Sequence, residues 1–324
     1  MHNPLQVLKH YWGYDGFRPG QAEVIDSILS GHDTLALMPT GGGKSITFQV
    51  PALANPGICL VISPLVALMK DQVKNLQKRG ILSAFISSEM PHWEILQQLD
   101  NCILGDYKLL YISPERISSE LFQEKLKTLS RKVNLLVVDE AHCISQWGND
   151  FRRDYRLIAD IRDAIPHVQV IAVTASATAA VVADICEQLH FRKGYRIFKT
   201  SFERKNLSFV VRKTDNKLKE ICHILSAVPG SAVIYSRTRK GVEEYAGKLR
   251  AAGISAEYFH AGLDPVLKTE RQTNWVKGFT RVLVATNAFG MGIDKGDVRV
   301  VIHTEFPDSM EAYYQEAGRA GRDG

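Results

Sequence analysis

Short apolar runs recur along the chain and alternate with longer segments in which apolar and polar residues are mixed. The runs are as long as β-strands, and their apolar residues are continuous rather than alternating. This pattern predicts strands that are buried on both faces. The predicted strands include Leu35–Met38, Cys59–Ile62, Leu109–Ile112, Leu135–Val138, Val168–Val173, Val233–Tyr235, Val282–Ala285 and Val298–Ile302.

The mixed segments between these runs predict amphipathic helices, among them Val66–Lys78, Thr178–Leu189, Gly241–Ala252 and Pro265–Lys277. Strands separated by helices indicate an α/β fold with parallel sheets built from right-handed β-α-β units. The alternation stops in a polar, charged stretch at residues 200–217, and 324 residues are too many for one ordinary core. We therefore predict two similar α/β domains, residues 1–200 and 201–324.

Composition adds little to this picture. The net charge of +5 permits a polyanionic partner but does not require one. No apolar run approaches the length of a membrane span, and residues 1–15 lack the apolar core of a signal peptide. We expect no membrane partner and a cytoplasmic, nucleoid-associated or nuclear location rather than secretion. The five scattered cysteines form no C-x-x-C pair, which favours reduced thiols over disulfides or a zinc site.

A glycine-rich segment at residues 39–45 follows the first predicted strand and precedes a helix. Its glycines let backbone N–H groups approach phosphate oxygens, Lys44 can reach the outer phosphates, and the Ser45 hydroxyl suits Mg²⁺. The long form of this motif has glycine where this chain has Met38, but the shorter Gly-x-Gly-Lys-Ser form is present. A simple helix-capping turn is the alternative. The candidate phosphate-binding residues are Thr40, Gly41, Gly43, Lys44 and Ser45.

An acidic pair, Asp139 and Glu140, directly follows the apolar run Leu135–Val138. The carboxyl ends of parallel strands form the edge at which such sheets bind ligands. Asp139 can hold Mg²⁺, usually through a water molecule, and Glu140 can orient and deprotonate an attacking water. A solvated turn is the alternative for the pair. The nearby His142 is a candidate relay or a merely structural residue.

Two arginines near the C-terminus, Arg319 and Arg322, stand three positions apart and would share one face of a helix. Such guanidinium groups can neutralise charge on a transferring γ-phosphoryl group, with effects of ~10³–10⁵ in rate. This role would require the two domains to close on the triphosphate. The alternative is an exposed basic helix.

Together with further segments, these motifs resemble the RecQ family of DNA helicases, in superfamily 2, over nearly all of residues 7–324. The resemblance implies two tandem RecA-like parallel-sheet domains, of which the first binds ATP and the second carries arginine fingers. The most family-specific segment is 139–148. The other matching segments are 17–21, 63–72, 111–116, 258–263, 285–294 and 315–324.

The resemblance also assigns residue roles. It implies that Gln21 hydrogen-bonds the adenine edge, that Arg18 lies against the base and that Tyr14 stacks on it. The nucleotide contacts would further include Asp294. The implied nucleic-acid contacts are Lys70 and Arg116 in the first domain and His260 and Thr286 in the second. The residues implied to couple nucleic-acid binding to hydrolysis are His142, Thr174 and Ser176.

The segment 147–156 interleaves aromatic rings with arginines and resembles the aromatic-rich loop of the family. Rings can stack on unpaired bases, a contact worth roughly 1–3 kcal/mol per base, while cations hold phosphates. We predict DNA contacts for Trp147 and Arg152. Core packing is a fair alternative for Phe151 and Tyr155.

The chain departs from the family in two places. Asn149 and Arg153 stand where the family has histidine and proline, which predicts a looser link between DNA binding and hydrolysis. The usual Thr-Ala-Thr-Ala motif has Ser176 in place of its second threonine, which keeps a hydroxyl group, so we expect coupling to survive. The sequence has no cysteine cluster like that of the family's zinc region. The resemblance therefore covers the motor core.

The function that the resemblance implies is ATP hydrolysis, with Mg²⁺, stimulated by DNA and coupled to 3′-to-5′ translocation on single strands and duplex unwinding in DNA repair and recombination. An RNA-dependent ATPase or helicase is one alternative, against which the run Cys143–Gly148 argues. A non-hydrolysing, ATP-gated nucleic-acid clamp is another, disfavoured by Glu140, Arg319 and Arg322. A small-molecule kinase is remote.

Overall fold

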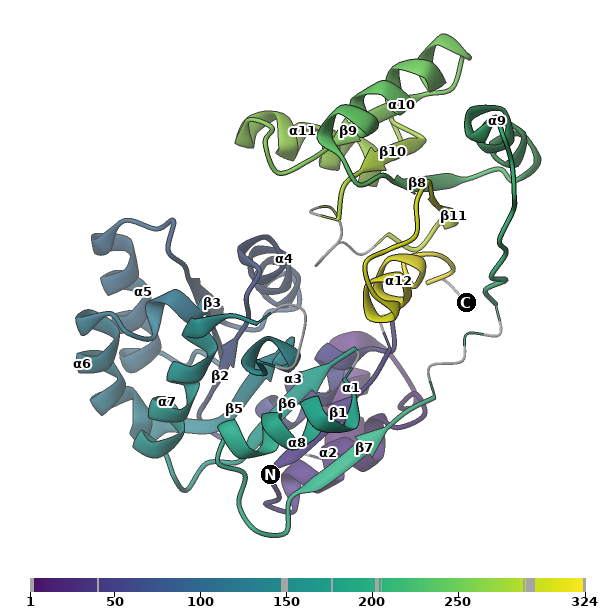
Figure 1. The fold of residues 1–324 in the computed structure, drawn as a ribbon. Helices are drawn as coiled ribbons and strands as arrows, with labels where there is room; N and C mark the ends of the chain where they lie inside the picture. Colours follow the sequence, from purple (N-terminus) through teal and green to yellow (C-terminus); the bar gives the residue numbers. More distant parts are fainter. Residues whose placement is uncertain are drawn as a thin grey trace. The chain divides into compact units, whose positions relative to one another are not determined.

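The computed structural model describes residues 3–322 except 40, 147–150, 176, 202–203, 205, 288 and 290–294. The chain divides into two compact units, Met1–Phe202 (unit 1) and Glu203–Gly324 (unit 2). Figure 1 shows that helices and strands alternate in each of them.

Unit 1 is built on a seven-stranded sheet with the order β3-β4-β2-β5-β6-β1-β7, in which every described pairing is parallel. Strands β1, β2, β4 and β6 are buried along their whole length, as their continuous apolar runs predict. The strands are β1 Thr34–Leu37, β2 Ile58–Ile62, β3 Ser83–Ile86, β4 Leu109–Ile112, β5 Val133–Asp139, β6 Val170–Thr174 and β7 Arg196–Lys199.

Helices cover both faces of this sheet, because successive strand residues point to opposite sides. Leu35 and Leu37 of β1 join one core and Ala36 joins the other. The core containing Ala36 packs α1 Pro4–Trp12, α2 Gln21–Leu29, α3 Lys44–Ala54 and α4 Val66–Gln77. The opposite core packs α5 His92–Leu104, α6 Glu120–Leu129, α7 Ile158–Ala164 and α8 Ala179–Gln188. Short 3₁₀ turns are η1 Pro114–Arg116, η2 Ser130–Lys132, η3 Ala141–Ile144 and η4 Arg153–Leu157.

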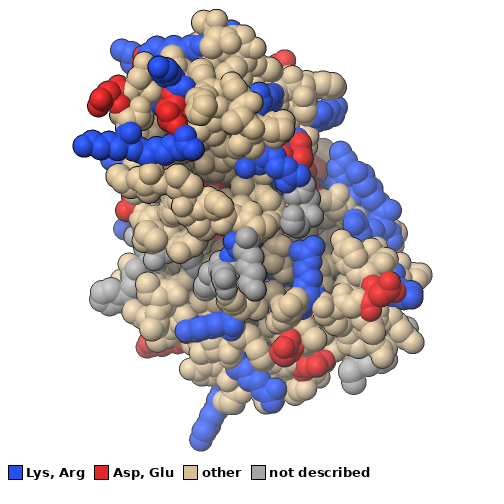
Figure 2. Space-filling model, turned by 90° about the vertical axis from the view of Figure 1, so that its right-hand side faces the viewer, with Lys and Arg blue, Asp and Glu red and all other residues tan. Residues whose placement is uncertain are grey.

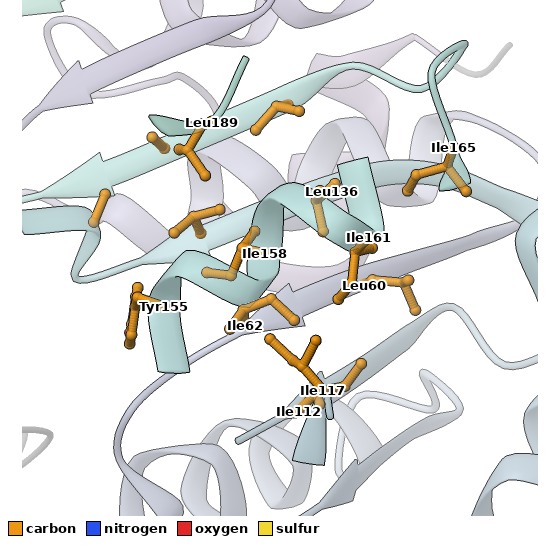
Figure 3. Packing of buried hydrophobic residues seen from close by; sticks show 14 of the residues in the cluster. Leu60, Ile62, Ile112, Ile117, Leu136, Tyr155, Ile158, Ile161, Ile165 and Leu189 are labelled. Carbon is orange, nitrogen blue, oxygen red and sulfur yellow. The ribbon is translucent and has the colours of Figure 1, made fainter. Parts of the chain in front are cut away.

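Tyr155 belongs to the second of these cores. Its side chain is fully buried, and Figure 3 shows it among the apolar residues that include Ile62 of β2 and Ile158 of α7. Of the two alternatives for this residue, core packing is therefore correct. A ring so placed cannot stack on a nucleic-acid base.

Unit 2 is built on a smaller parallel sheet with the order β11-β8-β10-β9. One face packs α9 Lys217–Ala227 and α10 Arg239–Ala251. The other face packs Trp275 of α11 Pro265–Val276 together with Phe289 and Ala320. Ala320 lies in the turn after α12 Met310–Ala317. The strands are β8 Ser231–Tyr235, β9 Ala256–Phe259, β10 Val282–Ala285 and β11 Val298–His303.

The predicted α/β class with parallel sheets is thus confirmed. All five cysteines are free thiols. Within the described part of the chain, no helix has the length and apolar character needed to cross a membrane. Among the same residues, no group of three or more His, Cys, Asp or Glu side chains could hold a metal ion by itself.

Candidate nucleotide and nucleic-acid sites

Three of the predicted catalytic residues, Lys44, Asp139 and Glu140, meet at one edge of the unit 1 sheet. Strands β1, β2, β5 and β6 are parallel neighbours, so their carboxyl ends lie together. The phosphate loop (residues 39–45) follows β1, Ser63 follows β2, and Asp139 ends β5. Thr174 ends β6 and pairs in register with Leu37. The topology alone therefore brings these separate motifs to a common place.

The phosphate loop is shaped for a close anion. Gly41 and Gly43 have φ values of 78° and 76°, which favour glycine. A Cβ atom on Gly43 would lie 2.4 Å from Nε2 of Gln21, and one on Gly42 would lie 2.9 Å from the carbonyl oxygen of Pro39. No described side chain caps the N-terminus of α3, whose first N–H groups and dipole therefore favour a phosphate.

Gln21 and Arg18 hold this loop. The Gln21 amide donates from Nε2 to the carbonyl oxygens of Gly43 (3.1 Å) and Gly42 (3.4 Å), and its Oε1 accepts from the Arg18 backbone N–H. Arg18 donates from Nη1 to the carbonyl oxygen of Gly41 at 2.9 Å. Tyr14 is 54% exposed. The adenine contacts of these three residues stay a prediction, and Thr40 lies outside the described residues.

The acidic pair faces Lys44. Nζ of Lys44 lies 3.8 Å from Oε1 of Glu140. Asp139 instead accepts hydrogen bonds from the Ser63 hydroxyl (3.2 Å) and from the Glu140 backbone N–H (3.0 Å). Burial and the negative charge of Glu140 raise the pKa of Asp139 to about 6, although Lys44 lowers it. Oε2 of Glu140 is buried and has no hydrogen-bond partner within the part of the chain that the structure describes. Two carboxylates beside one ammonium group fit a divalent cation, which Asp139 and Ser45 could hold.

Glu140 has a left-handed backbone, with φ 48° and ψ 47°. This conformation is unusual for a residue with a side chain and persists only where the surroundings enforce it. The enforcing contacts come from the hydroxyl of Tyr155, which donates to the Asp139 carbonyl oxygen at 2.9 Å, and from the Cys143 N–H, which donates to the Glu140 carbonyl oxygen at 2.9 Å. Tyr155 is thus a support of the acidic pair that the sequence did not indicate.

His142 lies between the acidic pair and the end of β6. Its Nδ1 is 2.8 Å from Oγ1 of Thr174 and 3.5 Å from Oε2 of Glu140, and its side chain is buried. The structure therefore brings together two of the residues assigned to coupling. Their coupling role stays a prediction, and the third residue, Ser176, lies outside the described part.

The described nucleic-acid candidates of unit 1 lie at the same edge of the sheet, near the ends of β2, β3 and β4. Arg116 donates from Nε and Nη2 to the carbonyl oxygens of Ser87 (2.9 Å) and Ser88 (3.0 Å), and so fixes the turn after β3. Exposed Lys70 pairs with Glu89 of this turn at 3.3 Å. Half-buried Arg152 donates to the carbonyl oxygen of Pro64 at 3.2 Å. Trp147 lies outside the described residues.

In unit 2, His260 and Thr286 follow the neighbouring strands β9 and β10 and are both buried. Nε2 of His260 lies 3.0 Å from Oε1 of Glu243, and its Nδ1 is buried with no hydrogen-bond partner in the described part of unit 2. The Thr286 N–H donates to the Phe259 carbonyl oxygen at 3.1 Å. Asp294 lies outside the described residues.

The sequence spacing suggested that Arg319 and Arg322 share one face of a helix. The structure shows that this prediction is wrong. Helix α12 ends at Ala317, and Gly321, with φ 60°, belongs to the turn that follows. Arg319 is only 7% exposed, and its Nε and Nη1 have no hydrogen-bond partner among the described residues. Arg322 is half-buried and donates from Nε to the Gly318 carbonyl oxygen at 3.4 Å. A buried guanidinium with unused donors suits an anionic ligand, so the alternative of an exposed basic helix is wrong.

The charge on the face that Figure 2 shows does not by itself outline a nucleic-acid path. Figure 2 shows Lys and Arg side chains spread over the face in view and interspersed with Asp and Glu. The specific residues at the strand ends therefore carry the argument for a nucleic-acid partner.

Comparison with known proteins agrees with this arrangement. Residues 18–185 match the DEAD/DEAH box helicase family, and residues 216–324 match the helicase conserved C-terminal domain. The chain is 44% identical to the ATP-dependent DNA helicase RecQ of Bacillus subtilis (strain 168), covering 100% of this chain and 55% of that protein. It is 41% identical to the ATP-dependent DNA helicase RecQ of Pasteurella multocida (strain Pm70), and the match covers 98% of this chain and 50% of that protein. The chain thus spans about half the length of these curated relatives.

A solved structure of the DUF1998 helicase MrfA bound to DNA and AMPPNP has the same fold. Its TM-score is 0.79 at 18% sequence identity, and the match covers 100% of this chain and 49% of that one. The likeness confirms two RecA-like α/β units.

Proposed function

Because the chain belongs to the DEAD/DEAH box helicases and carries the helicase core of the RecQ family, we propose that it is a motor that hydrolyses ATP when it binds single-stranded DNA. The observation that best supports this is the acidic pair. Glu140 is held in a left-handed conformation, with one carboxylate oxygen 3.8 Å from Lys44 and the other buried, with no hydrogen-bond partner in the described ranges. Such an oxygen is suited to accept a proton from water.

In this proposal the phosphates of ATP lie on the N–H groups of the phosphate loop and against Lys44. Mg²⁺, held by Ser45 and Asp139, would neutralise phosphate charge. Glu140 orients the attacking water and takes its proton. The unused donors of Arg319, with Arg322, bind the charge that develops on the outer phosphate.

DNA is proposed to contact five residues on the strand-end sides of the two sheets. Hydrolysis would then drive 3′-to-5′ movement along a single strand and the unwinding of duplexes, in repair or recombination. Such work would take place in the nucleoid of a cytoplasm or in a nucleus. The proposed DNA contacts within the described residues are Lys70, Arg116, Arg152, His260 and Thr286.

Steady-state ATP turnover with and without single-stranded DNA tests the proposal. We expect DNA to raise turnover at least tenfold, and equal rates would contradict the motor. Lys44→Ala should be inactive under both conditions, whereas Lys127→Ala, a change of an exposed lysine on α6, should behave as the parent. Greater stimulation by single-stranded RNA than by DNA would favour an RNA-dependent ATPase.

A further inference from the structure

Tyr235, the last residue of β8, lies in the core of unit 2 beside the arginine turn (residues 318–322). Its side chain is 4% exposed and packs in the cluster that contains Phe289 and Ala320. The phenol hydroxyl donates to the carbonyl oxygen of Phe289 at 3.0 Å. A buried hydroxyl that donates one hydrogen bond can still accept another.

The arginine turn lies beside Tyr235, because Ala320, the residue after Arg319, packs in the same core cluster. Burial raises the pKa of Tyr235 to about 12, although the positive charges of Arg319 and Arg322 lower it. The phenol is therefore protonated at neutral pH and presents its oxygen dipole, rather than a full negative charge, to the arginine. A phenolate would neutralise Arg319, whereas a phenol leaves its charge available to a ligand.

The ring of Tyr235 is held by His303, the last residue of β11. It stacks on His303 at 5.4 Å between ring centroids with an interplanar angle of 16°. Nε2 of His303 lies 2.8 Å from Oε2 of Glu316, whose side chain is also buried. The carbonyl oxygen of Glu316 accepts from the Arg319 N–H at 3.2 Å, so the same residue anchors the arginine turn.

We propose that Tyr235 is a positioning residue, which fixes the guanidinium of Arg319 in the orientation that hydrolysis requires, with the His303–Glu316 pair holding the turn. The inference rests on the proposed function, in which Arg319 binds the phosphate of ATP. A long side chain that is already oriented loses less freedom when the charge develops, so preorganisation raises the rate more than the affinity. Nothing in the sequence motifs of the second domain had given Tyr235 a role.

The first test is Tyr235→Phe, which removes one hydroxyl and keeps the ring. In DNA-stimulated turnover we expect kcat to fall about tenfold, while KM for ATP and the affinity for a fluorescent oligonucleotide change less than twofold. Tyr245→Phe is the matched control, because Tyr245 packs against the opposite face of the same sheet, and it should behave as the parent. An unchanged kcat in Tyr235→Phe would overturn the inference.

A double mutant shows whether Tyr235 acts through Arg319. If it does, Tyr235→Phe adds no further loss to Arg319→Ala, because residues that act as a unit are not additive. If kcat of the double mutant falls by the product of the two single-mutant losses, Tyr235 acts independently of Arg319. That result would overturn the inference. Glu316→Gln, at the other end of the network, should also lower kcat, and it should add no further loss to Arg319→Ala. The test therefore does not depend on one variant. Failure of the proposed function is distinguishable, since the parent itself would then lack DNA-stimulated turnover.

Discussion

Asp139→Asn should stabilise the nucleotide-free protein at neutral pH while it abolishes ATP turnover. The carboxylate is held beside Glu140, so its charge is unfavourable until a cation arrives. Asparagine keeps an oxygen that can accept from the Glu140 N–H and an amide that can donate to Ser63. The substitution therefore removes the charge with little change in packing.

The magnitude follows from the pKa of Asp139. Burial and Glu140 raise it from 3.8 to about 6, and each pKa unit corresponds to about 1.4 kcal/mol. The native state thus holds this proton more tightly than the unfolded chain, and the free energy of unfolding falls as pH rises from about 4 to 6. The full penalty, about 3 kcal/mol at most, is present above pH 6 and absent below pH 4. Partial solvent access reduces the expected gain in Asp139→Asn to about 1–3 kcal/mol at pH 7.5.

Urea unfolding at pH 7.5 and pH 4.5, in EDTA, measures this difference. We expect Asp139→Asn to be more stable than the parent at pH 7.5, by a margin that shrinks to about a third at pH 4.5. Asp71→Asn, a change of an exposed carboxylate on α4, is the control and should show no such dependence. In MgATP the order should reverse, since the nucleotide stabilises the parent alone. A variant that is less stable than the parent at both pH values would refute the reasoning.

Three further predictions follow from the same contacts. Lys44→Ala should reduce DNA-stimulated turnover to background with an unchanged circular dichroism spectrum, and residual turnover above a few per cent would exclude the phosphate role of the lysine. Arg322→Ala should lower kcat at least 100-fold, as loss of an arginine finger does, while the affinity for a fluorescent ATP analogue changes less than fivefold; normal kcat would contradict the assignment. Asp33→Asn should destabilise unit 1 by about 3–5 kcal/mol in urea unfolding, because buried Asp33 pairs with Arg162 (3.1 Å) and Arg192 (2.8 Å). A loss below 1 kcal/mol would show that the two arginines are satisfied without it.

The central strands could be predicted from the sequence because burial on both faces leaves a continuous apolar run. Strands β4 and β10 begin and end at the predicted residues, and β2 differs by one. The edge strand β7, Arg196–Lys199, is mostly exposed and carries charged residues at both ends. It is a strand because its backbone pairs with β1. The residues of β7 carry no local sequence pattern that predicts this pairing.

The gathering of Lys44, Asp139 and Glu140 could also be predicted, since the ends of parallel strands share an edge. The support of the pair by Tyr155 could not, because that hydrogen bond depends on how η4 packs beneath β5. The shared helix face of the two arginines was a wrong prediction: spacing alone suggested it, but the helix ends at Ala317.

Single-turnover hydrolysis of bound ATP tests the central claim most directly. With protein in excess over radiolabelled ATP and single-stranded DNA present, the parent should release phosphate at least tenfold faster than without DNA. Glu140→Gln should bind the same nucleotide and leave it intact. If the parent also left bound ATP uncleaved, or if Glu140→Gln cleaved it at the parent's rate, the acidic pair would not be the catalytic base of a DNA-driven motor.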